Sequence, residues 1–324
     1  MPPRSKHPQH FRAVAMLLLA NLFWGLSFPT IKALALLHEK VLPGSSSGFV
    51  TAMLVTPRYI VGALVMLIWQ GRRLGATSKL EVRQGFELGL FTTLGVLLQN
   101  DGLQHTQAST SAFLTQLYAV LIPAWVGLRQ RRNPGVRVWI SGGLVLIGVA
   151  ILGRFDWRTF SLGRGEWVTL LGSFFFAGQI LCLERKEFAG NDALRVTTVM
   201  FVTQAAMFSD FSMFIVPNVT SMARLWTSVP WLGGTLMLAG VCTVAAINIM
   251  NRWQPKITAI EAGLIYCVEP IFGALFALVL PAWYSRWSGI EYANETATLS
   301  LLIGGGLITA ANILINLRPT GLHK

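Results

Sequence analysis

Charge is scarce in this sequence. Only 12% of its 324 residues are Asp, Glu, Lys or Arg, whereas a soluble protein averages about 25%. Hydrophobic residues make up 53% of the chain, and apolar runs long enough to cross a bilayer recur from one end to the other. This excludes an ordinary soluble domain with a single anchor. The composition predicts an all-α integral membrane protein that crosses the bilayer many times.

Cysteine and recognisable catalytic motifs are also scarce. The three cysteines, Cys182, Cys242 and Cys267, each lie in an apolar run, which argues against a disulfide framework or a metal site. The chain has no glycine-rich loop ending in Lys-Ser/Thr, no His-Glu-x-x-His and no Gly-x-Ser-x-Gly. Its five histidines fall in segments expected to be termini or loops. We therefore expect neither ATP-driven pumping nor hydrolase chemistry, and no cofactor or metal.

The net charge of +12 does not indicate nucleic-acid binding. The basic residues lie in short connections between apolar segments, where the positive-inside rule places them. The expected partners are the lipid bilayer and a small-molecule substrate, with no nucleic acid. The oligomeric state is left open.

We predict ten transmembrane helices. They cover residues 12–37, 48–70, 84–103, 108–128, 136–152, 165–183, 195–217, 230–250, 257–282 and 298–317. The first is interpreted as a retained helix rather than a cleaved signal peptide, because its removal would leave one half of the chain a span short. With a cytoplasmic N-terminus, the inner segments hold 18 Lys and Arg against six in the outer loops. This bias predicts that both termini are cytoplasmic.

The two halves of the chain resemble each other. Residues 111–114, opening the fourth span, align with residues 261–264, opening the ninth, and each segment is expected to continue into a helix broken at a proline, Pro123 or Pro270. A glycine-rich span follows in both halves. Because five spans is an odd number, the halves must be inverted, which is typical of secondary transporters with broken helices. The predicted organisation is a tail (1–11), a first five-helix repeat (12–153), a linker (154–164), a second repeat (165–317) and a C-terminal tail (318–324).

Four stretches carry a family resemblance. They are Phe-Trp-Gly-Leu-Ser-Phe at 23–28 followed by Lys32, Arg-Tyr-Ile-Val-Gly-Ala at 58–63, Thr-Ser-Ala-Phe-Leu-Thr at 110–115 and Glu-Pro-Ile-Phe-Gly-Ala at 269–274. In this order, on a frame of five plus five spans, the sequence is similar to EamA-type members of the drug/metabolite transporter superfamily. The similarity extends from about residue 12 to residue 317. It implies a secondary transporter of small metabolites, amino acids or drugs that works without nucleotide hydrolysis.

Glu269 is the first candidate for chemistry, because an acid deep in an apolar span costs about 2.5–3.5 kcal/mol on insertion scales. It is either a proton-coupling group or a structural partner of a basic or hydroxyl group. Asp210 is a secondary candidate in the seventh span. Lys32 and Arg58 either grip a carboxylate or phosphate of the substrate or snorkel to the headgroups.

Other candidates for the substrate path are aromatic or polar groups inside spans. Each alternatively fills space or joins helices. With the two cations, the substrate-path candidates are Trp24, Lys32, Arg58, Gln116, Tyr118, Gln204, Asn248 and Tyr266.

The predicted function is export of a small polar metabolite, such as an amino acid, across the inner membrane by alternating access. Two other classes stay open at this point. One is an integral membrane enzyme using Glu269 and Asp210 as acid and base, and the other is a non-transporting receptor or assembly protein.

Overall fold

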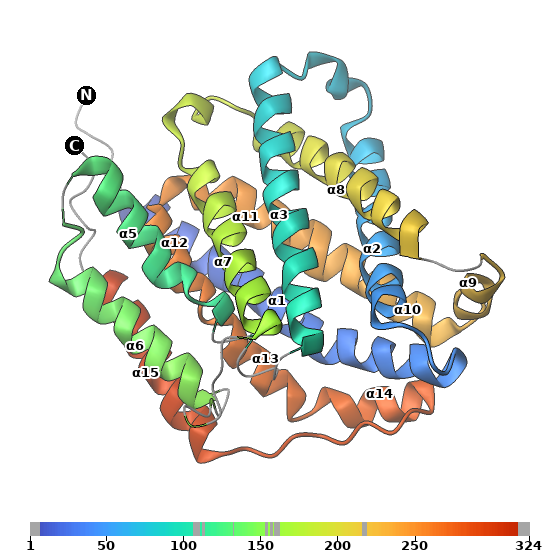
Figure 1. Cartoon of the computed structure of the whole chain (residues 1–324). Helices are drawn as coiled ribbons and strands as arrows, with labels where there is room; N and C mark the ends of the chain where they lie inside the picture. The colour runs from blue at the N-terminus through green and yellow to red at the C-terminus, as the bar shows by residue number, and fades with distance from the viewer. Residues whose placement is uncertain are drawn as a thin grey trace.

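The computed structural model describes residues 7–105, 111, 114–131, 133–152, 155, 158, 163–215 and 219–316. These residues form a helical bundle and contain no strand (Figure 1). The helices of the first half are α1 (His7–Val41), α2 (Ser47–Gln70), α3 (Lys79–His105), α5 (Tyr118–Gln130) and α6 (Val136–Leu152). A 3₁₀ turn, η1 (Gly71–Ala76), precedes α3.

The second half contains more breaks. Its helices and helical turns are α7 (Arg164–Leu183), η2 (Lys186–Phe188), α8 (Ala193–Ile215), α9 (Val219–Trp226), α10 (Val229–Met237), η3 (Leu238–Ala245), α11 (Ala246–Trp253), η4 (Gln254–Lys256), α12 (Ala259–Tyr266), α13 (Glu269–Ala277), α14 (Leu280–Ser288) and α15 (Leu299–Asn316). The segment η3 is π-helical and joins α10 to α11 without a gap.

Six segments of the described chain are long and apolar enough to cross a membrane. They are Gln9–Val41, Ser47–Gln70, Arg164–Leu183, Ala193–Ile215, Val229–Lys256 and Ala259–Ala277. Two shorter apolar helices cover Val136–Leu152 and Leu299–Ile315. The chain is therefore a multi-pass helical membrane protein, and the count of ten crossings stays a prediction.

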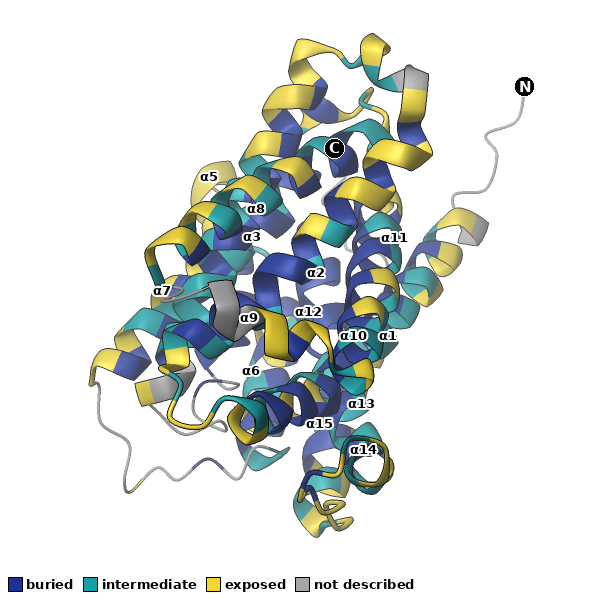
Figure 2. Cartoon of the chain, turned by 90° about the vertical axis from the view of Figure 1, so that its right-hand side faces the viewer, coloured by how far each residue is buried: buried dark blue, intermediate teal, exposed yellow. Residues whose placement is uncertain are grey.

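Burial is arranged as a bilayer requires. Buried residues lie on the facing sides of the helices and exposed ones on the outside (Figure 2). Large apolar side chains such as Ile68 and Phe214 are 80% and 89% exposed, while Phe201 and Phe208 are fully buried. A large exposed apolar surface marks a place where a protein contacts a partner or a membrane. In a membrane protein, the lipid acyl chains cover these side chains.

Neighbouring helices approach closely where glycines face each other. The pairs include α3 with α7, α6 with α15, α2 with α8, and α1 with α13. A Cβ at Gly304 would lie 2.5 Å from the carbonyl oxygen of Gly148, so α6 and α15 touch at their backbones. Gly85 and Gly89 pack α3 against α8, since a Cβ on either would meet a backbone oxygen of α8 at 2.7 or 3.0 Å. Small residues at i and i+4 allow this approach.

Contacts between connections define one end of the bundle. The imidazole of His10, in α1, lies 3.6 Å from the carboxylate of Glu261 at the start of α12. The backbone N–H of Asp192, just before α8, donates to Glu81 at the start of α3 over 2.9 Å. The segments predicted to be cytoplasmic therefore meet in pairs.

The opposite end is joined in the same way. Lys40, at the end of α1, donates to the carbonyl of Gly289 over 2.6 Å. Arg164, which begins α7, pairs with Asp101 near the end of α3 at 3.1 Å. These residues belong to the segments predicted to lie outside.

Two local expectations were wrong. His38 was expected in a loop, but it lies buried in the last turn of α1 and bonds the Ser45 hydroxyl at 3.1 Å. Pro123 was expected to break the fourth span, but α5 runs through it. The break falls earlier, at Gln116 and Leu117. Pro123 removes the one hydrogen bond that its N–H would donate within α5, and the helix continues through it.

Candidate functional site

The ninth predicted span is broken beside Glu269. Helix α12 ends at Tyr266, and α13 begins at Glu269 after the two-residue turn Cys267–Val268. Pro270 lies in the first turn of α13, where its missing N–H is not needed. Glu269 thus heads a half-helix, and the positive end of the helix dipole favours a carboxylate there.

The fourth predicted span has a matching break. Gln116 and Leu117 form a turn directly before α5, which begins at Tyr118. Both Gln116 and Tyr118 are 5% exposed, and the side-chain oxygen of Gln116 has no hydrogen-bond partner among the described residues. Leaving a buried amide oxygen without a hydrogen-bond donor costs free energy. The side-chain oxygen of Gln116 at this break can therefore accept a further hydrogen bond.

The two breaks touch each other. The Tyr118 phenol lies near the Cys267 thiol and the Glu269 carboxyl, and the thiol itself donates to the Gly263 carbonyl over 3.2 Å. Helices α5 and α12 can approach because Gly263 has no side chain: a Cβ there would lie 2.9 Å from Ile122. The structure therefore brings Gln116, Tyr118 and Glu269, all predicted from the sequence, into one region.

Trp24 and Tyr266 form an aromatic contact beside the break. Their ring centroids are 5.5 Å apart in an edge-to-face arrangement. The Tyr266 hydroxyl donates to the side-chain oxygen of Gln254 over 2.8 Å, and the Gln254 amide donates to the Ile180 carbonyl over 2.7 Å. Tyr266 is therefore held in one orientation by η4 and α7, and Trp24 packs against a fixed surface.

Arg58 reaches the site from α2. Its Nε donates to the Thr243 hydroxyl, and its Nη2 donates to the Cys242 carbonyl over 3.4 Å. Both acceptors lie in the π-helical segment η3, a type of distortion that is frequent at functional sites. Arg58 also interacts electrostatically with Glu269. Arg58 and Glu269 thus come from different halves of the chain and interact electrostatically.

Lys32 lies apart from these residues. It is exposed, and its ammonium lies 5.3 Å from the ring centroid of Tyr292. Burial, followed by the charges of Glu295 and Tyr284, raises the pKa of Tyr292 to about 12. The phenol is therefore neutral, and Lys32 makes a cation–π contact.

Asp210 also lies apart. It is exposed on α8 and has no hydrogen bond or ion pair with any described residue. The pairing with Lys32 or Arg58 that its sequence position allows is not formed.

Gln204 and Asn248 differ in how their amides are satisfied. Gln204 is fully buried on α8, and both of its amide atoms lack a partner among the described residues. Asn248 donates to the Val244 carbonyl over 2.7 Å and to the Met66 sulfur at 3.2 Å. Asn248 therefore joins α11 to α2, whereas Gln204 has its full hydrogen-bonding capacity unused.

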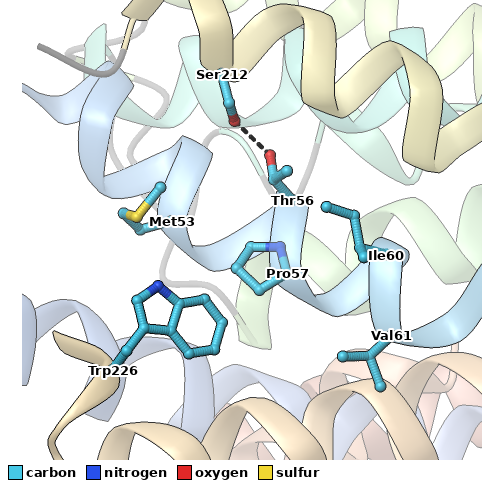
Figure 3. Close-up of a pocket in the computed structure, with 7 residues that line it drawn as sticks. All are labelled: Met53, Thr56, Pro57, Ile60, Val61, Ser212 and Trp226. Carbon is cyan, nitrogen blue, oxygen red and sulfur yellow. Dashed lines mark hydrogen bonds between the residues drawn. The ribbon is translucent and has the colours of Figure 1, made fainter. Parts of the chain in front are cut away.

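A small pocket of about 200 Å³ opens beside α2 (Figure 3). Its lining residues are Met53, Thr56, Pro57, Ile60, Val61, Ser212 and Trp226. The hydroxyls of Thr56 and Ser212 bond to each other at 2.5 Å, and Thr56 donates to the Phe208 carbonyl. With its hydroxyls paired, the pocket presents an apolar surface. Within the described residues, no group of His, Cys, Asp or Glu is suited to hold a metal ion.

Comparison with known proteins bears on the family resemblance of the chain. Residues 11–154 match the model of the EamA-like transporter family. The resemblance to EamA-type transporters is confirmed.

Two curated relatives align with most of the chain. An "Uncharacterized transporter" of Archaeoglobus fulgidus is 25% identical over 308 residues, covering 93% of this chain and 85% of the relative. "Protein RarD" of Streptomyces exfoliatus is 25% identical over 309 residues, covering 93% of this chain and 88% of its own. One crystal structure has the same fold, with a TM-score of 0.69 and 16% identity over 97% of this chain and all of its own. The family match and the two relatives support a membrane transporter, whereas the crystal structure shows the fold alone.

Sequence reasoning missed several residues of this candidate site. Thr243 and Cys242 receive Arg58, and Gln254 holds Tyr266. The signal available was weak, since hydroxyls within apolar spans commonly bond their own helix. Only the position of η3 against α2 shows that Thr243 serves a residue of another helix.

Proposed function

We propose that this protein is a secondary transporter that exports small polar metabolites, such as amino acids, across the inner membrane by alternating access. The observation that carries the proposal is the meeting of two broken helices: α5 packs against α12, and Tyr118, which begins α5, lies near Glu269, which begins α13. In secondary transporters, discontinuous helices supply the half-helix ends that bind substrates and coupling ions.

The proposed frame is ten crossings in two inverted repeats, 12–153 and 165–317, joined by 154–164, with both termini cytoplasmic. The helix pairings support it, because they persist when the halves are exchanged. Exchanging the halves replaces α3 by η3 and α11, and α7 by α1, so the packing of α3 on α7 corresponds to that of η3 and α11 on α1. In the same way, the packing of α2 on η3 corresponds to that of α8 on α3. The pairs α2–α8 and α6–α15 correspond to themselves.

The proposed binding groups are one cation and a set of aromatic and neutral polar side chains. Arg58 binds a carboxylate of the substrate, since a guanidinium matches a carboxylate in geometry and charge. Trp24 and Tyr266 form an aromatic wall, and the unpartnered amides of Gln116 and Gln204 offer hydrogen bonds to polar groups. In the resting arrangement, Thr243 and Cys242 hold the Arg58 side chain.

Glu269 is the proposed proton-coupling group. It is half-buried and has no ion pair with any described residue, yet it lies within the field of Arg58. A carboxylate in an apolar span that lacks a permanent partner can change its protonation as the surroundings change. An enzyme using Glu269 and Asp210 together has no support in the geometry, since Asp210 lies exposed on α8.

The test is flux in proteoliposomes loaded with a panel of radiolabelled amino acids. With an imposed pH gradient, the wild type should accumulate its substrate, and Glu269→Gln should lose accumulation while keeping substrate exchange. Asp210→Asn is the matched control, because it neutralises an exposed acid of a predicted span. Loss of coupling in Asp210→Asn, with coupling kept in Glu269→Gln, would contradict the assignment. Absence of flux for every compound in the wild type would contradict the transport proposal.

A further inference from the structure

Two cations lie over one tryptophan at the predicted cytoplasmic end of the bundle, and a third lies close to them. The ammonium of Lys256 lies 3.8 Å from the centroid of the Trp253 ring, and the guanidinium carbon of Arg12 lies 5.1 Å from it. Arg252 is the neighbour of Trp253 in the chain, and both Arg252 and Arg12 repel Lys256 electrostatically. Trp253 is buried, whereas the three cations are exposed. We call these four residues the Trp253 cluster.

A second cluster of cations at the same end of the bundle contains carboxylates, which the Trp253 cluster lacks. Arg83 and Arg185 lie 5.7 and 5.9 Å from the Phe188 ring centroid. Glu87 neutralises both, at 2.9 Å from Arg83 and 2.5 Å from Arg185, and Glu187 adds longer contacts. Two cations over an aromatic ring are thus balanced here by two carboxylates.

The Trp253 cluster has no such carboxylate. Its three cations form no ion pair and no hydrogen bond with the described part of the chain. Nearby, the carboxylate of Glu261 accepts from the backbone and hydroxyl of Thr258 and faces His10. Like charges held close together without a counter-charge are destabilising unless an anion joins them.

The location of the cluster favours a lipid as the source of that anion. Arg12 begins the predicted first span, and its neighbour Phe11 is 76% exposed, as suits a side chain beside acyl chains. The positive-inside rule explains cations at this end, but it does not explain why two of them lie over one ring, with a third close by, without an acid. Basic pockets between helices at the cytoplasmic surface suit anionic lipid headgroups.

We propose that the Trp253 cluster binds the headgroup of an anionic phospholipid. Arg12, Arg252 and Lys256 hold the phosphodiester, and Phe11 lies against the acyl chain. The indole of Trp253 occupies the interface between headgroup and hydrocarbon, which is the usual place for tryptophan in membrane proteins. The bound lipid supplies the negative charge that the protein does not.

The experiment uses the full-length protein, purified in a non-ionic detergent and delipidated. Short-chain phosphatidylglycerol is titrated, and binding is counted by native mass spectrometry, with melting temperature as a second readout. Phosphatidylcholine of the same chain length and glycerol phosphate are the comparison ligands. Arg12→Gln with Lys256→Gln should raise the phosphatidylglycerol dissociation constant about 30-fold, from the surface energy of two basic residues. Mass counting reports binding even if this double variant melts at a lower temperature.

The control is Lys79→Gln with Arg129→Gln, which removes two exposed cations of the same predicted face and gives the same net charge. It should bind phosphatidylglycerol as the wild type does. An equal loss in the control would show a general charge effect and overturn the proposal. Glycerol phosphate binding as tightly as phosphatidylglycerol would show a site for soluble anions, and equal binding of phosphatidylcholine would show no selectivity for anions. Either result would overturn it as well.

Discussion

Arg58 and Thr243 are joined by a hydrogen bond from the guanidinium Nε to the threonine hydroxyl, between α2 and the π-helical segment η3. Thr243 is fully buried. In an α-helix its hydroxyl would most often bond the carbonyl four residues earlier, but here it serves a charged side chain of another helix. This bond fixes where the one cation near Glu269 in the described site points, so it connects the distortion of η3 to the electrostatics of the broken helices.

Thr243→Val should destabilise the protein by about 1.5–3 kcal/mol, the usual range for a hydrogen bond to a charged group. Valine keeps the shape of threonine but cannot accept from Arg58. The melting temperature in detergent measures the effect. Thr93→Val is the control, because the Thr93 hydroxyl is buried with no partner among the described residues, and its loss should be neutral or stabilising. An equal fall in both variants would show that the Arg58 bond is not the cause.

Arg58 and Lys32 should differ in substrate binding. Arg58→Gln should weaken anionic substrates more than neutral ones, because the guanidinium is the cation within reach of Glu269. Lys32→Gln should leave the preference unchanged, because Lys32 lies over Tyr292. Competition between a charged and a neutral analogue in the flux assay measures the preference. An unchanged preference in Arg58→Gln, or a lost one in Lys32→Gln, would show that the wrong cation has been assigned.

Glu81 should make the protein less stable in acid. Burial by itself raises the pKa of Glu81, but hydrogen bonds from the Ser78 and Asp192 backbones and the Ser78 hydroxyl, with the charge of Arg195, outweigh it and lower the pKa below its usual value. A depressed folded-state pKa stabilises the protein above the unfolded pKa, near 4.3. This stabilisation is lost as the pH falls from there through the lower folded pKa.

The measurement is melting temperature against pH, from 7 downward, for the wild type and Glu81→Gln. The variant should be less stable at pH 7 and should lose less on acidification, so the two curves converge. Glu291→Gln, which neutralises an exposed acid, should follow the wild type. Parallel curves for the wild type and Glu81→Gln would contradict the linkage.

Gly25 should not tolerate a side chain. It lies between Trp24 and the half-helix α13, and a Cβ there would collide with Phe272 and lie 2.9 Å from the backbone nitrogen of Gly273. Gly25→Ala should therefore cost about 1–3 kcal/mol through overpacking and displace α13 from α1. Gly306→Ala is the control, because open space surrounds Gly306 and alanine favours a helix. Melting temperatures that do not fall in Gly25→Ala would show that α13 can shift without cost.

Much of the fold could be predicted from the sequence, since apolar runs and their basic flanks determine where helices begin and end. Where the structure describes them, the predicted spans overlap helices or runs of consecutive helices, and residues 108–110 and 112–113 of the fourth lie outside the described residues. The breaks are less predictable. Pro270 marks one correctly, because it lies in the first turn of the half-helix α13. Pro123 does not mark the other, because α5 continues through it despite the missing backbone donor.

The candidate site is only partly visible in the sequence, for a physical reason. A charged residue within an apolar run stands out, so Glu269 and Arg58 can be identified from the sequence alone. Which of these residues meet depends on helix rotation and packing, and so Lys32 and Asp210 look equivalent to them in the sequence but lie apart in the fold. The acceptor Thr243 is one hydroxyl among many in the spans.

Tyr266 and Gln254 should be energetically coupled. Tyr266→Phe leaves the side-chain oxygen of Gln254 buried without its donor, and Gln254→Met leaves the Tyr266 hydroxyl and the Ile180 carbonyl without partners. Each single variant should lose about 1–3 kcal/mol, the desolvation cost of a buried group left unpaired.

The double variant decides between coupling and independent packing. It removes both members of the Tyr266–Gln254 bond, so its loss should be smaller than the sum of the single losses by about 0.5–3 kcal/mol, as for residues in direct contact. Denaturant-induced unfolding in detergent supplies the free energies. Because neither substitution touches Glu269 or Arg58, substrate preference should persist while the Trp24 contact loosens. Additive losses would mean that the hydroxyl and the amide act separately, and Trp24 would then pack against a ring that Gln254 does not hold.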